Sequence, residues 1–261
     1  SVTDLPGFGT IAIVVFVVLY APILTLVFYS FNAGLSPAEW KGFSLDWYVV
    51  AFANEEVKAA TWVSIKVAFW AAILSTALAT MAALGTTRRA AFKGQTFIYV
   101  MINQPLMVPE IVTAVALLLL VAALKKLTGY SGLGYLILAH TAFCLPFASL
   151  PPPARLEGMD LTLETADADL YASPWATFRR VTLPLLTPGI FAGAMLAFVT
   201  SLDDVVITEF IKSPGQDTLP TYMPGQLRRS MKPDVNAIST VLLGVTLILL
   251  VAFFLTSRNK K

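Results

Sequence analysis

Long apolar stretches separated by short polar segments dominate the chain. A bilayer-spanning helix needs about 20 mainly apolar residues, and six stretches reach that length. Five of them contain no Lys, Arg, Asp or Glu and lie between these charged residues: Asp4 and Glu39, Lys66 and Arg88, Lys126 and Arg155, Arg180 and Asp203, Asp234 and Arg258. The sixth runs from Gln95 to Leu124 and is interrupted only by Glu110. The pattern therefore predicts an all-α polytopic membrane protein with six transmembrane helices.

Composition supports this interpretation and excludes several function classes. The chain is 57% hydrophobic and only 13% charged, whereas a soluble domain carries about 25% charged residues. A net charge of +2 without a basic, aromatic-rich run gives no reason to expect nucleic acid as a partner. The one cysteine, Cys144, cannot form a disulfide within the chain. We expect one membrane domain over residues 1–261, in contact with membrane lipid.

Positive charges between the stretches predict the orientation. The first stretch is too long for a signal-peptide core and has no basic residue before it, so we expect a retained helix. Six spans place both termini on the same side, and Lys and Arg in short loops favour the cytoplasm. The loop after the second span and the C-terminal tail hold more of them than the loop after the third span: Arg88, Arg89, Lys93, Arg258, Lys260 and Lys261 against Lys125 and Lys126. Both termini are therefore predicted to be cytoplasmic.

One polar segment, "ETADADLYASPWATFRRVTLPLLTPGI" from Glu164 to Ile190, stands out between the fourth and fifth spans. Thr162 is a candidate cap for a first short helix, and Ser173 followed by Pro174 predicts the start of a second. The acidic residues in the first helix would be repelled by anionic lipid. We therefore expect the segment over residues 160–187, the coupling segment, to dock onto another protein.

The coupling segment resembles the cytoplasmic signature of permease subunits of bacterial ABC importers. That signature is Glu-Ala-Ala, three residues, Gly, nine residues, then Ile-x-Leu-Pro. Here the same spacing joins Thr165-Ala166-Asp167, Tyr171 and Val181-Thr182-Leu183-Pro184, with Glu164 one position before the frame and Tyr171 in place of Gly. Further stretches, such as "PLMVPEIV" and "SLDDVVITEFIKSPGQDTLP", resemble the second membrane subunit of the polyamine (spermidine/putrescine) branch.

The resemblance implies the type I ABC importer permease fold and a set of partners. These are a homologous permease, two cytoplasmic ATPase subunits that bind ATP and Mg, and a periplasmic substrate-binding protein, in the bacterial inner membrane. No cofactor and no catalytic role are implied for this chain itself. The resemblance assigns contact with the ATPase to one run of residues: Glu164, Thr165, Ala166, Asp167, Asp169, Leu170, Tyr171 and Ala172.

Three acidic residues lie in or beside apolar stretches: Glu110, Asp203 and Asp204. A carboxylate costs roughly 2.5–3.5 kcal/mol at the centre of a membrane helix, so a functional role is the first expectation. We predict that they line the pathway of a cationic solute. Adjacent helical residues point about 100° apart, so Asp203 and Asp204 face one ligand only if the helix unwinds. The alternatives are pairing with Lys66, capping a helix, or bonding to the partner permease.

Other chemistry finds little support. The chain has no Gly-Lys pair and hence no phosphate-binding P-loop. His140 and Cys144 stand four residues apart on the fourth span, but two ligands make no closed metal site, so a packed helix face is the expected role. Import of another small organic solute and ion-coupled secondary transport stay open as alternatives. A membrane enzyme is disfavoured, because no nucleophile motif accompanies the one histidine.

Overall fold

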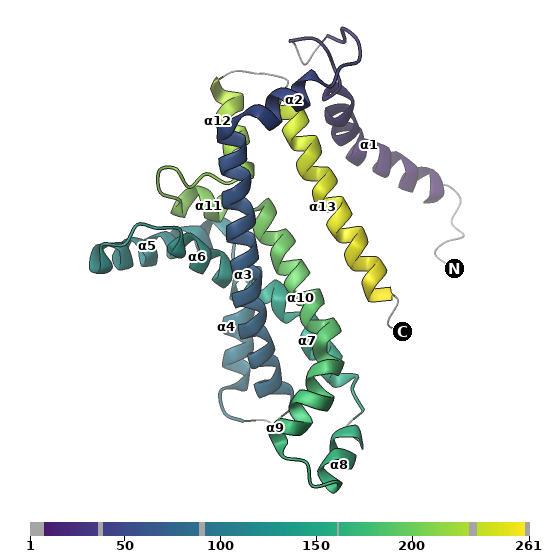
Figure 1. Ribbon diagram of the computed structural model, residues 1–261, viewed down its shortest axis with the longest axis vertical. Helices are drawn as coiled ribbons and strands as arrows, with labels where there is room; N and C mark the ends of the chain where they lie inside the picture. The colour runs from purple at the N-terminus through teal and green to yellow at the C-terminus, as the bar shows by residue number, and fades with distance from the viewer. Residues whose placement is uncertain (1–7, 36–38, 89–91, 161, 230–233, 259–261) are drawn as a thin grey trace. The chain divides into compact units, whose positions relative to one another are not determined.

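The computed structural model describes residues 8–35, 39–88, 92–160, 162–229 and 234–258. Within these ranges the chain is helical, and the one β-type pairing is an isolated bridge between Asn32 and Phe43. The helices are α1 (Phe8–Tyr29), α2 (Asp46–Ala53), α3 (Glu55–Thr87), α4 (Gln95–Met107), α5 (Glu110–Thr128), α6 (Gly134–Ser149), α7 (Pro151–Glu157), α8 (Thr162–Asp169), α9 (Pro174–Thr177), the π-helix η2 (Phe178–Thr182), α10 (Leu183–Asp203), α11 (Val206–Ile211), α12 (Leu219–Arg229) and α13 (Asp234–Arg258) (Figure 1). The predicted all-α fold is confirmed.

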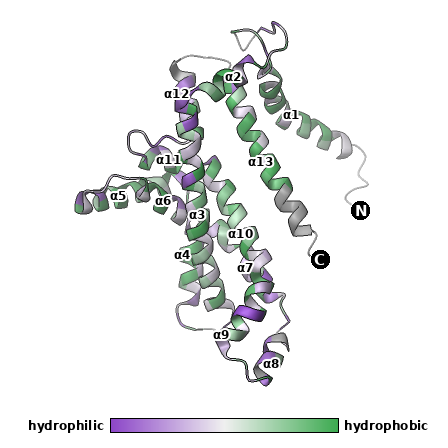
Figure 2. Ribbon diagram, in the orientation of Figure 1, coloured by the Kyte–Doolittle hydropathy of each residue, from purple (hydrophilic) through white to green (hydrophobic). Residues whose placement is uncertain are grey.

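Six helical segments of the described chain are long and apolar enough to cross a membrane, as predicted. They are Gly9–Tyr29, Glu55–Thr87, Glu110–Thr128, Gly134–Glu157, Pro174–Asp203 and Asp234–Val251. Figure 2 shows the hydrophobic colour along α10 and the first part of α13, while hydrophilic residues gather on α12 and around α9. The spans and the polar segments therefore alternate along the chain as the sequence pattern indicates.

The third span is shorter than the sequence predicts, because the apolar stretch from Gln95 to Leu124 contains a helix break. Val108, between α4 and α5, is extended, with φ −110° and ψ 142°. Pro109 disfavours helical geometry at the residue before it, and α5 begins directly after it, at Glu110. Pro105, by contrast, lies inside α4. The spanning helix is α5, and Glu110 stands at its first residue instead of its interior.

The chain divides into two compact units, one formed by residues 1–59 and 222–250 and the other by residues 60–221 and 251–261. In the first unit, the fully buried Asn32 orders the loop after α1. Its side-chain oxygen accepts from the amides of Gly34 and Lys41, at 3.1 and 2.9 Å, and its amide group donates to the Glu39 carbonyl. This division describes packing alone, so the single permease domain over residues 1–261 stays a prediction.

Small residues let the helices of the second unit approach closely. Its core includes Ala72 and Ala79 of α3, Ala139 and Ala148 of α6, and Ala197 of α10, all buried. On α10, a β-carbon built on Gly193 would lie 2.5 Å from the carbonyl oxygen of Ala148. Small residues at such crossings are typical of helix packing in membranes, where dispersion contacts replace the hydrophobic effect between helices.

A separate apolar cluster lies at the end of the second unit that carries α8 and α9. Ala83 of α3, Leu156 of α7 and Leu186 of α10 are its buried members, and Met159 packs against them. In Figure 1, α8 and α9 lie beyond the end of α10. The helices that carry the spans are thus held together directly at the base of the coupling segment.

Candidate functional site

The fifth span ends at the Asp203–Asp204 pair. Asp203 is the last residue of α10, Asp204 is extended with φ −67° and ψ 134°, and α11 begins at Val206. The two carboxylates therefore do not share one continuous helix. From the sequence, both side chains could face one ligand only if the helix unwinds. The structure meets this condition.

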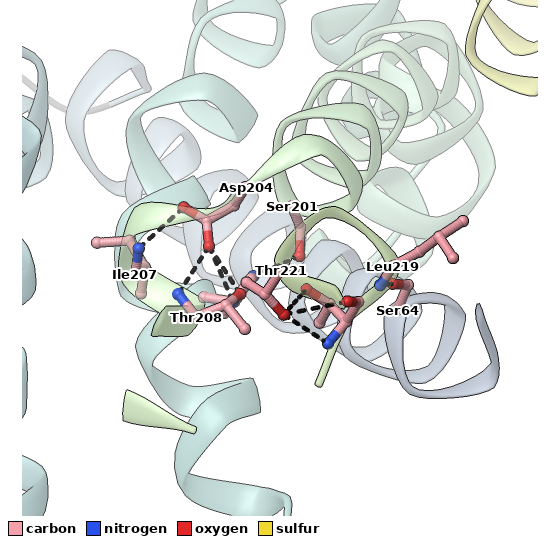
Figure 3. A network of polar contacts seen from close by, with 9 residues as sticks. Ser64, Ser201, Asp204, Ile207, Thr208, Leu219 and Thr221 are labelled. Atoms are coloured by element: carbon pink, nitrogen blue, oxygen red, sulfur yellow. Dashed lines mark hydrogen bonds and ion pairs between the residues drawn. The ribbon is translucent and has the colours of Figure 1, made fainter. Parts of the chain in front are cut away.

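The Asp204 carboxylate is enclosed and serves as the N-terminal cap of α11. One oxygen accepts from the amide of Ile207 at 3.1 Å, and the other accepts from the amide and the hydroxyl of Thr208, both at 2.8 Å (Figure 3). No part of its side chain is exposed. Carboxylates are strong caps because they satisfy the free amides of the first turn. Asp204 thus has the capping geometry that stood among the alternatives.

His140 joins this network from α6, with its whole side chain buried. Its Nδ1 lies 2.7 Å from the hydroxyl of Ser201, and its Nε2 lies 2.9 Å from the hydroxyl of Thr208. Because Thr208 gives its one hydroxyl proton to Asp204, the hydrogen on Nε2 must be donated to Thr208. His140 therefore ties α6 to α10 and α11. Sequence reading missed this role, because it considered only Cys144 as a neighbour.

Glu110 and Asp203 are exposed, in contrast to Asp204. Glu110 lies near enough to Asp204 for their carboxyl groups to interact directly, and α5 and α11 pack against one another. The structure thus brings Glu110 and the Asp pair together, where the third span begins and the fifth span ends. Lys66 does not neutralise them, since its ammonium group lies over the ring of Trp62, 5.2 Å from the centroid. Clustered carboxylates favour a cation between them, because like charges repel.

The coupling segment forms two short helices, as predicted. Ser173 caps α9 by accepting from the amide of Ala176 at 3.3 Å, and Pro174 is the first helical residue. Thr162, predicted as the cap of the first helix, is instead the first residue of α8. Its amide donates to Asp160 at 2.9 Å, and this bond lowers the pKa of the Asp160 carboxyl. Tyr171 has φ +60°, so the left-handed turn that Gly would supply is formed by a tyrosine.

The residues assigned to ATPase contact divide between two sides of α8. Thr165, Ala166, Asp169 and Leu170 are exposed, and Tyr171 after the helix is 98% exposed. Glu164 and Asp167 are partly buried and bond to other parts of this chain, namely to Arg88 and to Thr177. The Ala172 side chain is partly buried and its amide donates to the carbonyl of Asp167. Trp175, 69% exposed, adds a third large apolar group, which the sequence analysis did not single out.

Comparisons with known proteins agree with this architecture. Residues 75–259 match the family described as "Binding-protein-dependent transport system inner membrane component". The chain is 36% identical over 250 residues to the "Putrescine transport system permease protein PotI" of Escherichia coli, covering 94% of this chain and 89% of that protein. It is 37% identical over 247 residues to the "Spermidine/putrescine transport system permease protein PotC" of Haemophilus influenzae, covering 94% of each.

Solved structures show the same fold at low sequence identity. The "Crystal structure of a bacterial ABC transporter involved in the import of the acidic polysaccharide alginate" contains a chain that matches with a TM-score of 0.71 and 16% identity. The match covers 96% of this chain and 93% of that chain. The fold, the six spans and the family match together give the identity: this chain belongs to the family of inner membrane components of binding-protein-dependent transport systems.

Proposed function

We propose that this chain is one of two membrane subunits of an ATP-driven polyamine importer in the bacterial inner membrane. The observation that carries the substrate class is the pair of exposed carboxylates, Glu110 at the start of the third span and Asp203 at the end of the fifth. Amines of the lysine type are protonated at neutral pH, so a polyamine presents several ammonium groups. Similarity to putrescine and spermidine permeases over 94% of the chain supports the same class.

The coupling segment supports the second half of the proposal, which is an external motor. Leu170, Tyr171 and Trp175 expose large apolar surfaces, at 80%, 98% and 69%, beside a turn that places them outward. Aromatic groups presented in this way are typical anchors of protein interfaces. We assign them to contact with one of two cytoplasmic ATPase subunits, which would bind ATP and Mg and hydrolyse the nucleotide. A homologous permease would complete the pathway, and a periplasmic binding protein would deliver the solute.

Asp204 has a different part in this proposal from its neighbour. Its carboxylate is occupied by the amides and hydroxyl of α11, so it shapes the pathway by fixing the helix break. Glu110 and Asp203 are the groups that would meet the solute. The rival class within the same family, an importer of another small organic cation, shares these carboxylates and differs in which solute the binding protein delivers.

The first test is uptake by the reconstituted complex with its binding protein and ATP. Glu110→Gln and Asp203→Asn each remove one charge with little change in shape. Losing one charge-assisted contact of about 1.5–3 kcal/mol should raise the KM for putrescine or spermidine roughly ten- to hundredfold. Uptake of radiolabelled polyamine, measured against concentration, gives this KM.

Asp46→Asn is the matched control, because Asp46 is an exposed carboxylate in the first turn of α2 and has no part in the proposed pathway. Its KM should equal that of the unmodified complex. Unchanged KM in both pathway variants, or polyamine uptake by this chain alone without ATP, would contradict the proposed function. The latter result would favour an ion-coupled secondary transporter.

A further inference from the structure

The inner side of α8 carries two acidic residues one helical turn apart, and both bond to other parts of the permease. Glu164 accepts from the Arg88 guanidinium at 2.9 Å and from the Thr182 hydroxyl at 2.8 Å, both on the same oxygen. Asp167 accepts from the Thr177 hydroxyl at 2.6 Å. Residues three apart share a helix face, so the partly buried side of α8 is acidic. Its exposed side is formed by Thr165, Ala166, Asp169 and Leu170.

These bonds join three separate segments at one carboxylate. Arg88 follows directly on α3, which ends at Thr87, and Thr182 is the last residue of η2, which continues into α10. Glu164 lies on α8 between them in the chain. The second and fifth spans are therefore both tied to α8 by hydrogen-bonded polar groups.

The surroundings of this carboxylate make the bonds strong for a site near the membrane surface. The side chains of Arg88 and Glu164 are only 18% and 26% exposed, and Thr182 is buried. Arg88 also lies 3.7 Å from the sulfur of Met159, which packs on the apolar cluster at the base of the segment. A charge pair shielded from water interacts more strongly than an exposed one, since the local dielectric constant is lower.

Glu164 also stands one position before the first residue of the family's Glu-Ala-Ala frame, which Thr165 occupies here. Adjacent residues of an α-helix point about 100° apart. A carboxylate at position 164 therefore faces another direction than one at position 165, whose side chain is on the exposed side. The one-residue offset moves the carboxylate from the docking side to the permease side of α8.

We propose that Arg88, Glu164 and Thr182 form an internal transmission joint, in which Glu164 links α8 to the second and fifth spans. Glu164 and Arg88 are positioning residues: they carry a displacement of α8 into the spans and take no part in ATPase contact or solute binding. This inference rests on the proposed function in one respect, namely that an ATPase moves α8. The exposed side of α8 then contacts the ATPase, while its partly buried side bonds to the spans.

The experiment uses the assembled complex and compares Glu164→Gln, Arg88→Gln and the exchanged pair R88E/E164R. Each single variant should retain co-purification with the ATPase, since the outward side of α8 is unaltered. Solute transported per ATP hydrolysed should fall in each, by roughly two- to thirtyfold for a residue on a coupling path. The exchanged pair should recover most of the loss, because it restores an opposite-charge contact at the same place.

The matched control is Glu157→Gln, which removes an exposed carboxylate near the same end of the unit and outside the coupling segment. It should transport the same amount of solute per ATP as the unmodified complex. A loss in this control equal to that in Glu164→Gln, or an exchanged pair no better than the single variants, would refute the joint.

A second readout is independent of the solute and so separates failure of the joint from failure of the proposed function. Spin labels at Leu78→Cys on α3 and Phe191→Cys on α10, both about half exposed, are introduced in a Cys144→Ser background. Their separation should change when ATP, Mg and vanadate trap the ATPase, and Glu164→Gln should reduce that change at least about twofold. If the change in spin-label separation is as large in Glu164→Gln as in the unmodified complex, the joint is refuted. This holds even if the complex carries a solute other than a polyamine.

Discussion

At the scale of single residues, the two adjacent aspartates have different structural roles, although they are neighbours in the sequence. Asp203 ends α10 with an exposed side chain, whereas Asp204 is extended and enclosed. The difference arises from the unwinding between α10 and α11, which turns one carboxylate outward and the other onto the amides of Ile207 and Thr208. The resulting cap holds α11 against His140, through the hydroxyl of Thr208.

Truncation of each aspartate should separate these roles. Asp204→Ala removes a cap, worth about 0.5–2 kcal/mol, and leaves buried donors of Thr208 without an acceptor, at about 1–3 kcal/mol. It should lower the thermal midpoint of the purified protein in detergent, measured by the fluorescence of its tryptophans. Asp204→Asn keeps an acceptor oxygen and should lose less. Asp203→Ala should leave the thermal midpoint unchanged within experimental error. An equal decrease in both alanine variants would exclude the capping role of Asp204.

Tyr171 shows how a turn can form against the preference of its residue. The family frame has Gly here, and Gly adopts positive φ without steric cost. Tyr171 adopts φ +60° nonetheless, a conformation that costs an ordinary residue roughly 1–2 kcal/mol. The amide of Ala172 stabilises the turn by donating to the carbonyl of Asp167 at 3.2 Å. The aromatic ring is thereby presented to solvent at the tip of the coupling segment.

At the scale of the elements, close helix packing depends on single glycines. Gly193 of α10 faces the backbone of α6, and an added β-carbon would lie 2.5 Å from the carbonyl oxygen of Ala148. Backbone atoms cannot move aside as a flexible side chain can. The contact between α10 and α6 therefore holds the fifth span against the fourth, at a level between His140 and the coupling segment.

Gly193→Ala should force these two helices apart and destabilise the protein by about 1–3 kcal/mol, the usual cost of overpacking. The measurement is the thermal midpoint in detergent. Gly85→Ala is the control, because Gly85 lies in α3 with nothing within 4 Å of an added β-carbon. The thermal midpoint of Gly85→Ala should stay the same or rise, because Ala is a better helix former than Gly by about 1 kcal/mol. A midpoint for Gly193→Ala as high as that control would mean that the helices do not meet at this carbonyl.

At the scale of the whole molecule, the orientation in the membrane is open to a direct test. The loops' Lys and Arg pattern predicts that the coupling segment is cytoplasmic and that the loop after α5 is outside. The chain has one cysteine, Cys144, which is buried. A Cys144→Ser background therefore allows cysteines to be introduced one at a time at exposed positions such as Leu170 and Ser131.

In vesicles from cells that produce the permease without its ATPase subunits, a membrane-impermeant maleimide should label Leu170→Cys when the vesicles are inverted and not when they are right-side-out. Ser131→Cys, in the loop between α5 and α6, should show the opposite pattern. Labelling is measured by the mass shift of the protein on a gel after solubilisation. Leu170→Cys labelled from outside would place the coupling segment away from any cytoplasmic ATPase and would contradict the predicted orientation.

The sequence by itself determined the features that depend on local composition. The six spans follow from apolar stretches of sufficient length, and the start of α9 follows from Ser173 with Pro174. The family follows from a spacing of residues that needs no structure to be read. These signals are local, because transfer into lipid and proline geometry act on consecutive residues.

Only the tertiary structure decided which side chain each polar group meets. Asp204 and His140 are 64 residues apart in the chain, and Arg88 and Glu164 are 76 apart, so no periodicity relates them. Their pairing depends on how α3, α6, α8, α10 and α11 pack, which is set by small residues at the crossings. For the same reason the sequence did not show that Glu164 and Asp167 of α8 bond to Arg88 and Thr177 of this chain while Asp169 is exposed.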